Sequence, residues 1–329
     1  MHTTPSAPAY AAGPTSAPAL RAVRLLALVL AALLPALALA VPRPAAAAPW
    51  RPFASSSPFN TPVTDRPALD PRSAAMVARV SRDGQAYAAL YEFGIPIYTA
   101  DATTPQVNVT CTMEAEWGPC PLSQQPMRIP TRAVPQPGSD GALVVIDNTN
   151  DTVGEYWKAT RTASGWQASY GAVNSLRGSG WGGSSTGAGA SRLGGVVRVS
   201  EVTAGSIDHA LVVASDTVCA GVFRAPALKT DGTSSSSDCL PEGARLQLDP
   251  TLDLATLTGL TDGERMVARA LQTYGAYVID VGGAPLSVSF QRAPDATATN
   301  PGSVYTSAGF AWDYYGMPHI PWDRLRVLA

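Results

Sequence analysis

Three side chains that could act together in acid–base chemistry lie close to one another in the segment 198–215. Arg198, Glu201 and His209 offer a guanidinium, a carboxylate and an imidazole. An imidazole changes charge near neutral pH, and neighbouring charges can move its pKa across that range. We therefore expect His209 to be the catalytic acid or base of a site to which Arg198 and Glu201 contribute charge.

The same histidine could instead have a structural role. A strand over 207–214 would place its side chain on one face with the apolar side chains of Ile207, Leu211 and Val213. A histidine on such a face can be a core residue whose ring nitrogens are both hydrogen-bonded, because buried polar groups must be paired. The sequence leaves both interpretations open.

A catalytic His209 needs a carboxylate that fixes its tautomer and a cleft that holds a substrate. Asp147 and Asp280 come at the ends of predicted strands and are the candidates for that carboxylate. The glycine-rich stretch 178–195 has no periodicity and comes shortly before His209. Long loops of this kind are usually functional or disordered, so we expect it to cover the site.

Cleavage of a polysaccharide suits these groups in two ways. A glycoside hydrolase needs two carboxyl groups at the scissile bond. A lyase needs a base and a cation that neutralises a uronate, roles open to His209 or Tyr274 and to Arg198 or Lys158. Trp157 and Trp181 could stack on sugar rings, although a core position is the alternative for Trp157.

Other chemistries lack their signatures. The chain has no Gly-x-Ser-x-Gly elbow, and no Gly-Lys-Ser/Thr follows the glycine-rich stretch. The segment 147–151 has Thr149 where a calcium loop has a carboxylate or amide, and no glycine follows Asp151, so a hairpin turn explains it better. We expect no metal and no cofactor.

The amino terminus has the features of a secretory signal. Residues 1–48 contain no acid, and Arg21 and Arg24 precede an apolar run over 25–40. That run is shorter than the ~20 residues of a membrane span. We expect cleavage near residue 40 or 47 and a secreted, extracellular protein without a membrane segment.

The rest of the chain carries more acid than base. The sequence has 23 basic and 25 acidic residues, and the predicted leader contains arginines but no acid. A nucleic-acid partner is therefore not expected, because phosphate backbones are bound by clustered basic side chains. The expected partner is an extracellular polysaccharide or cell-wall glycan, bound by a monomer.

Four cysteines in an exported chain indicate disulfides. Each consecutive pair brackets a polar loop, so local closure is the simplest of three possible connectivities. The predicted bridges are Cys111–Cys120 and Cys219–Cys239.

Short alternating strands with turns between them predict a mainly β fold. We expect an antiparallel two-sheet sandwich, jelly-roll-like, with a few short helices, in a single domain over 49–329. Residues 49–71 form an extended arm anchored by Phe53 and Phe59, and Thr261 with Glu264 forms a capping box that opens a helix. The predicted strands are 142–147, 155–161, 166–170, 244–248, 276–280 and 286–290.

Several motifs resemble those of a widespread, uncharacterised group of secreted bacterial proteins. They are Ser57-Pro-Phe-Asn60, Gly195-Val-Val-Arg198 with Glu201, Gly205-Ser-Ile-Asp-His209-Ala-Leu211, Leu271-Gln-Thr-Tyr-Gly275 and Asp280-Val-Gly-Gly. The resemblance spans nearly the whole chain after the leader and implies no activity. The group has a histidine two positions after the aspartate that matches Asp140, where this chain has Ala142.

The sequence thus favours a secreted carbohydrate-active protein, a polysaccharide lyase or glycoside hydrolase that uses His209 with nearby carboxylates. The alternatives are a non-catalytic β-sandwich that binds carbohydrate or cell wall, and a structural secreted protein. An enzyme should place His209, at least two carboxylates and an aromatic side chain around one concavity, whereas a binder should show an exposed aromatic strip without a perturbed titratable group.

Overall fold

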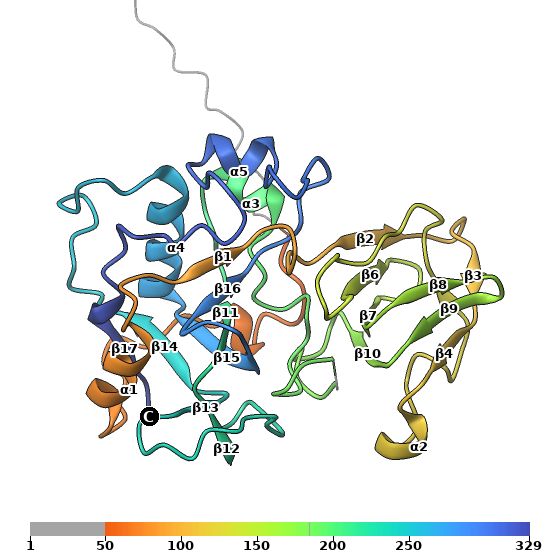
Figure 1. The fold of residues 1–329 in the computed structure, drawn as a ribbon, viewed down its shortest axis with the longest axis horizontal. Helices are drawn as coiled ribbons and strands as arrows, with labels where there is room; N and C mark the ends of the chain where they lie inside the picture. The colour runs from red at the N-terminus through yellow and green to blue at the C-terminus, as the bar shows by residue number, and fades with distance from the viewer. Residues whose placement is uncertain (1–49, 184) are drawn as a thin grey trace, which may run out of the picture. The chain divides into compact units, whose positions relative to one another are not determined.

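The larger of the two main sheets contains six strands. The computed structural model describes residues 50–183 and 185–329, so the predicted leader and its cleavage sites lie outside the described residues. The strand order is β1, β16, β11, β15, β14 and β17 (Figure 1). The bounds are β1 Tyr87–Ala89, β16 Ser287–Ser289, β11 Leu211–Ser215, β15 Ala276–Val281, β14 Arg245–Leu248 and β17 Leu325–Val327. β1 pairs parallel with β16 and β11 pairs parallel with β15, while the other neighbours are antiparallel.

Alternation along β11 divides the core between the two faces of this sheet. Leu211 and Val213 pack in one cluster with apolar residues of α1 (Ser73–Val80) and α4 (Asp262–Thr273). Val212, between them, packs on the other face with residues that include Phe59. Full burial of each such side chain contributes about 1.5–3 kcal/mol, so both faces stabilise the strand.

Helix α4 begins at the predicted capping box. Thr261 Oγ1 accepts a hydrogen bond from the Glu264 N–H at 3.1 Å, and Glu264 Oε2 accepts one from the Thr261 N–H at 2.9 Å. The helix ends at Thr273, two residues before Gly275, whose φ of 70° is left-handed. Apolar residues from Met266 to Leu271 face the core, as the 3.6-residue period predicts.

The second main sheet has four strands in the order β10, β7, β6 and β2 (Figure 1). Its strands are β2 Ile97–Ala100, β6 Leu143–Asp147, β7 Thr152–Trp157 and β10 Tyr170–Ser175. β6, β7 and β10 form the predicted antiparallel meander, and β2 adds to β6 in parallel. The predicted strand 155–161 is interrupted at Lys158, whose φ of 53° is left-handed, and resumes as part of a separate sheet.

Three small sheets and the remaining helices complete the fold. The small sheets are β4 (Val109–Cys111), β9 (Gly165–Ala168) and β8 (Thr160–Thr162); β3 (Gln106–Val107) with β5 (Met127–Arg128); and β12 (Val218–Phe223) with β13 (Leu240–Glu242). The short helices are α2 (Glu114–Trp117), α3 (Val199–Ala204) and α5 (Ser303–Ser307), with 3₁₀ turns at Pro58–Asn60 and Trp322–Arg324. A mainly β fold with a few short helices is therefore confirmed, although the pairing is mixed where antiparallel pairing was expected throughout.

Both predicted disulfides are present, Cys111–Cys120 and Cys219–Cys239. The amino-terminal arm is anchored by Phe53 and Phe59, which are both buried. Within the described residues, no helix is long and apolar enough to cross a membrane.

Candidate active site

The structure brings His209, Glu201 and Arg198 together, but in the interior. Their exposed fractions are 2%, 1% and 5%, which leaves no surface for a substrate. His209 Nε2 lies 3.0 Å from Glu201 Oε1, and Nδ1 lies 2.9 Å from the carbonyl oxygen of Ala210. Arg198 donates to the Glu201 carboxylate through Nη2 and, at 2.8 Å, through its backbone N–H, which caps α3.

His209 precedes the sheet instead of lying in it, because β11 begins only at Leu211. Gly205 ends α3 with a left-handed φ of 74°, and the Ala210 N–H donates to the carbonyl of Phe59 at 2.7 Å. The ring nitrogens contact Glu201 and the carbonyl oxygen of Ala210. The sequence had instead predicted a contact with Asp147 or Asp280 that fixes the tautomer. The geometry supports the structural interpretation of this histidine.

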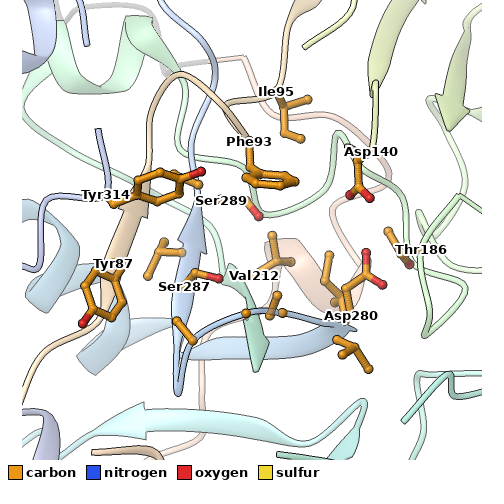
Figure 2. Close-up of a pocket in the computed structure, with 18 of the residues that line it drawn as sticks. Tyr87, Phe93, Ile95, Asp140, Thr186, Val212, Asp280, Ser287, Ser289 and Tyr314 are labelled. Atoms are coloured by element: carbon orange, nitrogen blue, oxygen red, sulfur yellow. The ribbon is translucent and has the colours of Figure 1, made fainter. Parts of the chain in front are cut away.

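Asp140 and Asp280 are two of the three aspartates that line one large cavity, and Asp83 is the third. This cavity of about 720 Å³ lies along β1, β16 and the end of β15. Figure 2 shows the carboxyl groups of Asp140 and Asp280 on one side of the cavity, close to Thr186, with Tyr87 and Tyr314 on the opposite side. Asp280 lies on β15 of the six-stranded sheet, and Asp140 lies in the turn just before β6 of the four-stranded sheet. Each main sheet therefore positions one of the two acids.

Arg192 connects the two aspartates. Its Nη1 lies 3.5 Å from Asp140 Oδ2, and its Nη2 lies 3.7 Å from Asp280 Oδ2. Arg192 belongs to the glycine-rich loop, which lines this cavity, whereas the sequence predicted that it covers a site around His209. One guanidinium thus holds two carboxyl groups that belong to distant parts of the chain.

Glu155 holds the glycine-rich loop in place through hydrogen bonds. This buried carboxylate accepts hydrogen bonds from Ser185 Oγ at 2.5 Å, from Ser191 Oγ and from the Leu193 N–H at 3.2 Å. Burial raises the pKa of Glu155, and the hydrogen bonds act in the opposite direction. The loop is therefore held by β7 on both sides of Arg192.

Asp280 stands in an acidic environment. Burial raises its pKa to about 7, Arg192 opposes this, and the charges of Asp231 and Asp140 add to the rise. The remaining 20% of its side-chain surface is exposed. A carboxyl group that keeps its proton near neutrality thus lines the cavity.

Glu242 is a third acid with a raised pKa, after Glu155 and Asp280. Burial brings the pKa to about 8, and the charges of Asp231 and Asp280 contribute. One oxygen from each of Asp231, Glu242 and Asp280 lies within 4.8 Å of the others, a spacing that would also suit a cation. Protons on Glu242 and Asp280 relieve the same repulsion, so the arrangement does not require a metal.

Gly187 allows the acids to approach the loop this closely. A Cβ at this position would lie 2.4 Å from Asp231 Oδ1 and 2.5 Å from Glu242 Oε1. The Gly187 N–H donates to Asp280 Oδ1 at 3.1 Å. A glycine here lets the backbone contact three carboxyl groups at once.

A second cavity, of about 540 Å³, adjoins the first and shares Asp140, Arg192 and Asp280 with it. Its outer wall contains the aromatic side chains of Trp117, Trp157 and Tyr170. The indole Nε1 of Trp157 donates to Asp140 Oδ1 at 3.2 Å. We refer to these two adjoining cavities together as the groove, and the two acids lie where the cavities meet.

The other predicted site residues lie in several places. Lys158 Nζ sits 4.5 Å from the ring centroid of Trp157, next to the groove. Asp147 caps the β6–β7 turn, where it accepts from the Thr149 N–H at 2.9 Å, as expected for a hairpin. Trp181 packs between Phe59 and Tyr277, and Tyr274 lines a different cavity beside α4.

Three groove residues, Arg192, Asp231 and Trp117, were not predicted as site residues, and neither was Glu242, which lies behind the groove lining. None lies in a chemical motif, and only the folded chain brings them near Asp280. Asp140 entered the sequence analysis only as the residue that would match an aspartate of the group that the chain resembles.

Comparison with known proteins does not assign the site. No family model, no curated protein and no solved structure matches this chain.

Proposed function

We propose that the groove is the active site of a secreted glycoside hydrolase that cleaves an extracellular polysaccharide or cell-wall glycan. The observation that carries this proposal is the pair Asp140 and Asp280, joined by Arg192 at the centre of a groove with aromatic walls. Two carboxyl groups in different environments are what hydrolysis of a glycosidic bond requires. The leader-like sequence of residues 1–48 and the two disulfides support export.

Asp280 is the general acid in this mechanism. Its pKa of about 7 keeps a proton on the carboxyl group at neutral and mildly acidic pH. The proton passes to the glycosidic oxygen as the bond to the anomeric carbon breaks. The leaving sugar then departs as an alcohol.

Asp140 acts as the ionised partner. The Trp157 indole N–H donates to one of its oxygens, and Arg192 lies 3.5 Å from the other. Both contacts stabilise a negative charge. An ionised Asp140 can accept a proton from the attacking water or attack the anomeric carbon itself.

A lyase is less well supported. It would need a base beside the groove, whereas the predicted base His209 is buried and the other, Tyr274, lines a different cavity. The exposed Trp117 favours a second function, a carbohydrate-binding protein without catalysis. The experiment below separates binding from turnover.

The test is the release of reducing ends from a panel of polysaccharides by the native protein and by Asp140→Asn and Asp280→Asn. Each substitution should lower turnover by about 10²–10⁴-fold, because it removes an acid–base group, while the melting curve stays cooperative. Asp208→Asn, a change of the same kind outside the groove, is the control. Retention of polysaccharide without any release of reducing ends would establish the binding protein instead.

A further inference from the structure

Trp117 is a half-exposed aromatic residue at one end of the groove. Its ring stacks on Trp157, with centroids 5.7 Å apart and planes at 16°, and meets Tyr170 edge to face at 5.6 Å. Trp117 nevertheless keeps 52% of its surface exposed. One face of the indole is therefore packed, and the other is free for a ligand.

The loop that presents Trp117 is held in place before any ligand arrives. The Cys111–Cys120 disulfide closes it. Glu114 Oε1 accepts hydrogen bonds from the Cys120 N–H at 2.9 Å and from Ser123 Oγ at 2.5 Å, and the Tyr170 hydroxyl donates to the Pro119 carbonyl at 2.8 Å. A preorganised aromatic face binds with little loss of conformational entropy.

The aromatic wall is continuous with the acids. Trp117, Trp157 and Asp140 line the same cavity, and Trp157 is hydrogen-bonded to Asp140. A chain that passes between Asp140 and Asp280 and continues along this cavity would reach the free face of Trp117. Sugar rings present a face of C–H groups that packs on an indole.

The charge of the groove selects the kind of chain. Asp140, Asp231 and Asp280 line the cavity beside Trp117, and Glu242 lies behind them. Of the two cations in this lining, Arg192 is paired with acids, which leaves Lys229. Each uronate of a charged chain would need a cation partner and only Lys229 is left for that role, whereas an uncharged chain needs none.

We propose that Trp117, supported by Trp157 and Tyr170, is an outer subsite that binds a sugar ring of an uncharged polysaccharide. This inference rests on the proposed function in one respect: the hydrolase proposal defines where the cleaved bond lies relative to the subsite. Binding at Trp117 does not require catalysis, so the two proposals can fail separately.

Native affinity electrophoresis tests the subsite. Separate gels contain uncharged polysaccharides (xylan, mixed-linkage β-glucan, mannan and an α-glucan) or the polyuronates alginate and polygalacturonate. At least one uncharged polysaccharide should retard the native protein, and Trp117→Ala should weaken that binding about tenfold or more, as for a central aromatic contact. Trp50→Ala, which removes an equally exposed tryptophan outside both cavities, should bind like the native protein.

The outcomes separate this inference from the hydrolase proposal. Retardation that depends on Trp117 without cleavage of any polysaccharide supports the subsite and refutes the hydrolase. Cleavage that depends on Asp280, together with unchanged binding by Trp117→Ala, refutes the subsite alone. The inference is also overturned if no uncharged polysaccharide retards the native protein, or if polyuronates are bound in preference.

Discussion

His209 stabilises the start of α3 through Glu201. Both ring nitrogens lie within hydrogen-bond distance of a partner, the Ala210 carbonyl oxygen or the Glu201 carboxylate. Removal of the ring leaves a buried carboxylate with one partner fewer and a cavity beside it. The residue therefore has a structural task that its neighbours in the sequence do not reveal.

The variant His209→Ala should consequently lose stability and keep its activity. The expected loss in the free energy of unfolding is about 1–3 kcal/mol, the penalty for unpaired buried polar groups. Denaturant titration measures this loss, and active-site-normalised turnover measures activity. A variant as stable as the native protein but without turnover would show instead that His209 takes part in catalysis.

Glu242 gives stability an unusual pH dependence. Its pKa rises from the model-compound value of 4.5 to about 8 in the folded protein, and that of Asp280 rises from 3.8 to about 7. At pH values between the unfolded-state and the folded-state pKa of each group, the folded state binds more protons than the unfolded state. The free energy of unfolding therefore falls as pH rises through this range. The native protein should therefore be less stable near pH 8 than near pH 5.

Glu242→Gln should remove part of this slope. The amide has no proton to lose and no charge to bury, so the variant should gain relative to the native protein as pH rises toward 8. Denaturant titrations at several pH values between 5 and 8 provide the comparison. Parallel curves for the two proteins would show that Glu242 is ionised in the fold at all these values.

At the scale of elements, the glycine-rich loop depends on β7. Glu155 lies on that strand and receives hydrogen bonds from both sides of Arg192. Glu155→Ala should loosen the loop and expose the peptide bond after Arg192 to trypsin. Mass spectrometry of a limited digest should show faster cleavage there than in the native protein or in Glu116→Ala, an exposed glutamate control. Equal cleavage rates in all three proteins would contradict the anchoring role.

Local chemistry explains which elements can be predicted from the sequence. The capping box of Thr261 and Glu264 sets the start of α4, and short loops set the β6–β7 hairpin and both disulfides. The parallel pairing of β11 with β15 has no such signal, because a long connection joins the strands. The site depends on this pairing, which brings Ala214 beside Asp280, and on a turn that places Asp140 opposite. Asp280 and Trp157 were therefore accessible to sequence reasoning as single residues, whereas their neighbours were not.

At the scale of the whole molecule, each disulfide closes a loop that contributes to the lining of the groove. Trp117 lies between Cys111 and Cys120, and Asp231 lies between Cys219 and Cys239. The two main sheets supply the rest, with Asp140 at the edge of one and Asp280 in the other. The groove is thus assembled from segments that are distant in sequence, and the loops that complete it are covalently closed.

In the proposed mechanism, Asp280 acts as a protonated acid whose pKa is raised by burial and further by its acidic neighbours. The most direct measurement is the pH dependence of kcat/KM on a polysaccharide that the native protein cleaves. For the native protein kcat/KM should fall above a pH of about 7, as the carboxyl group loses its proton. Asp231→Asn removes one of the charges that raise this pKa, so its profile should fall at a lower pH. A profile that stays level through pH 8, or a fall at the same pH in both proteins, would contradict the account.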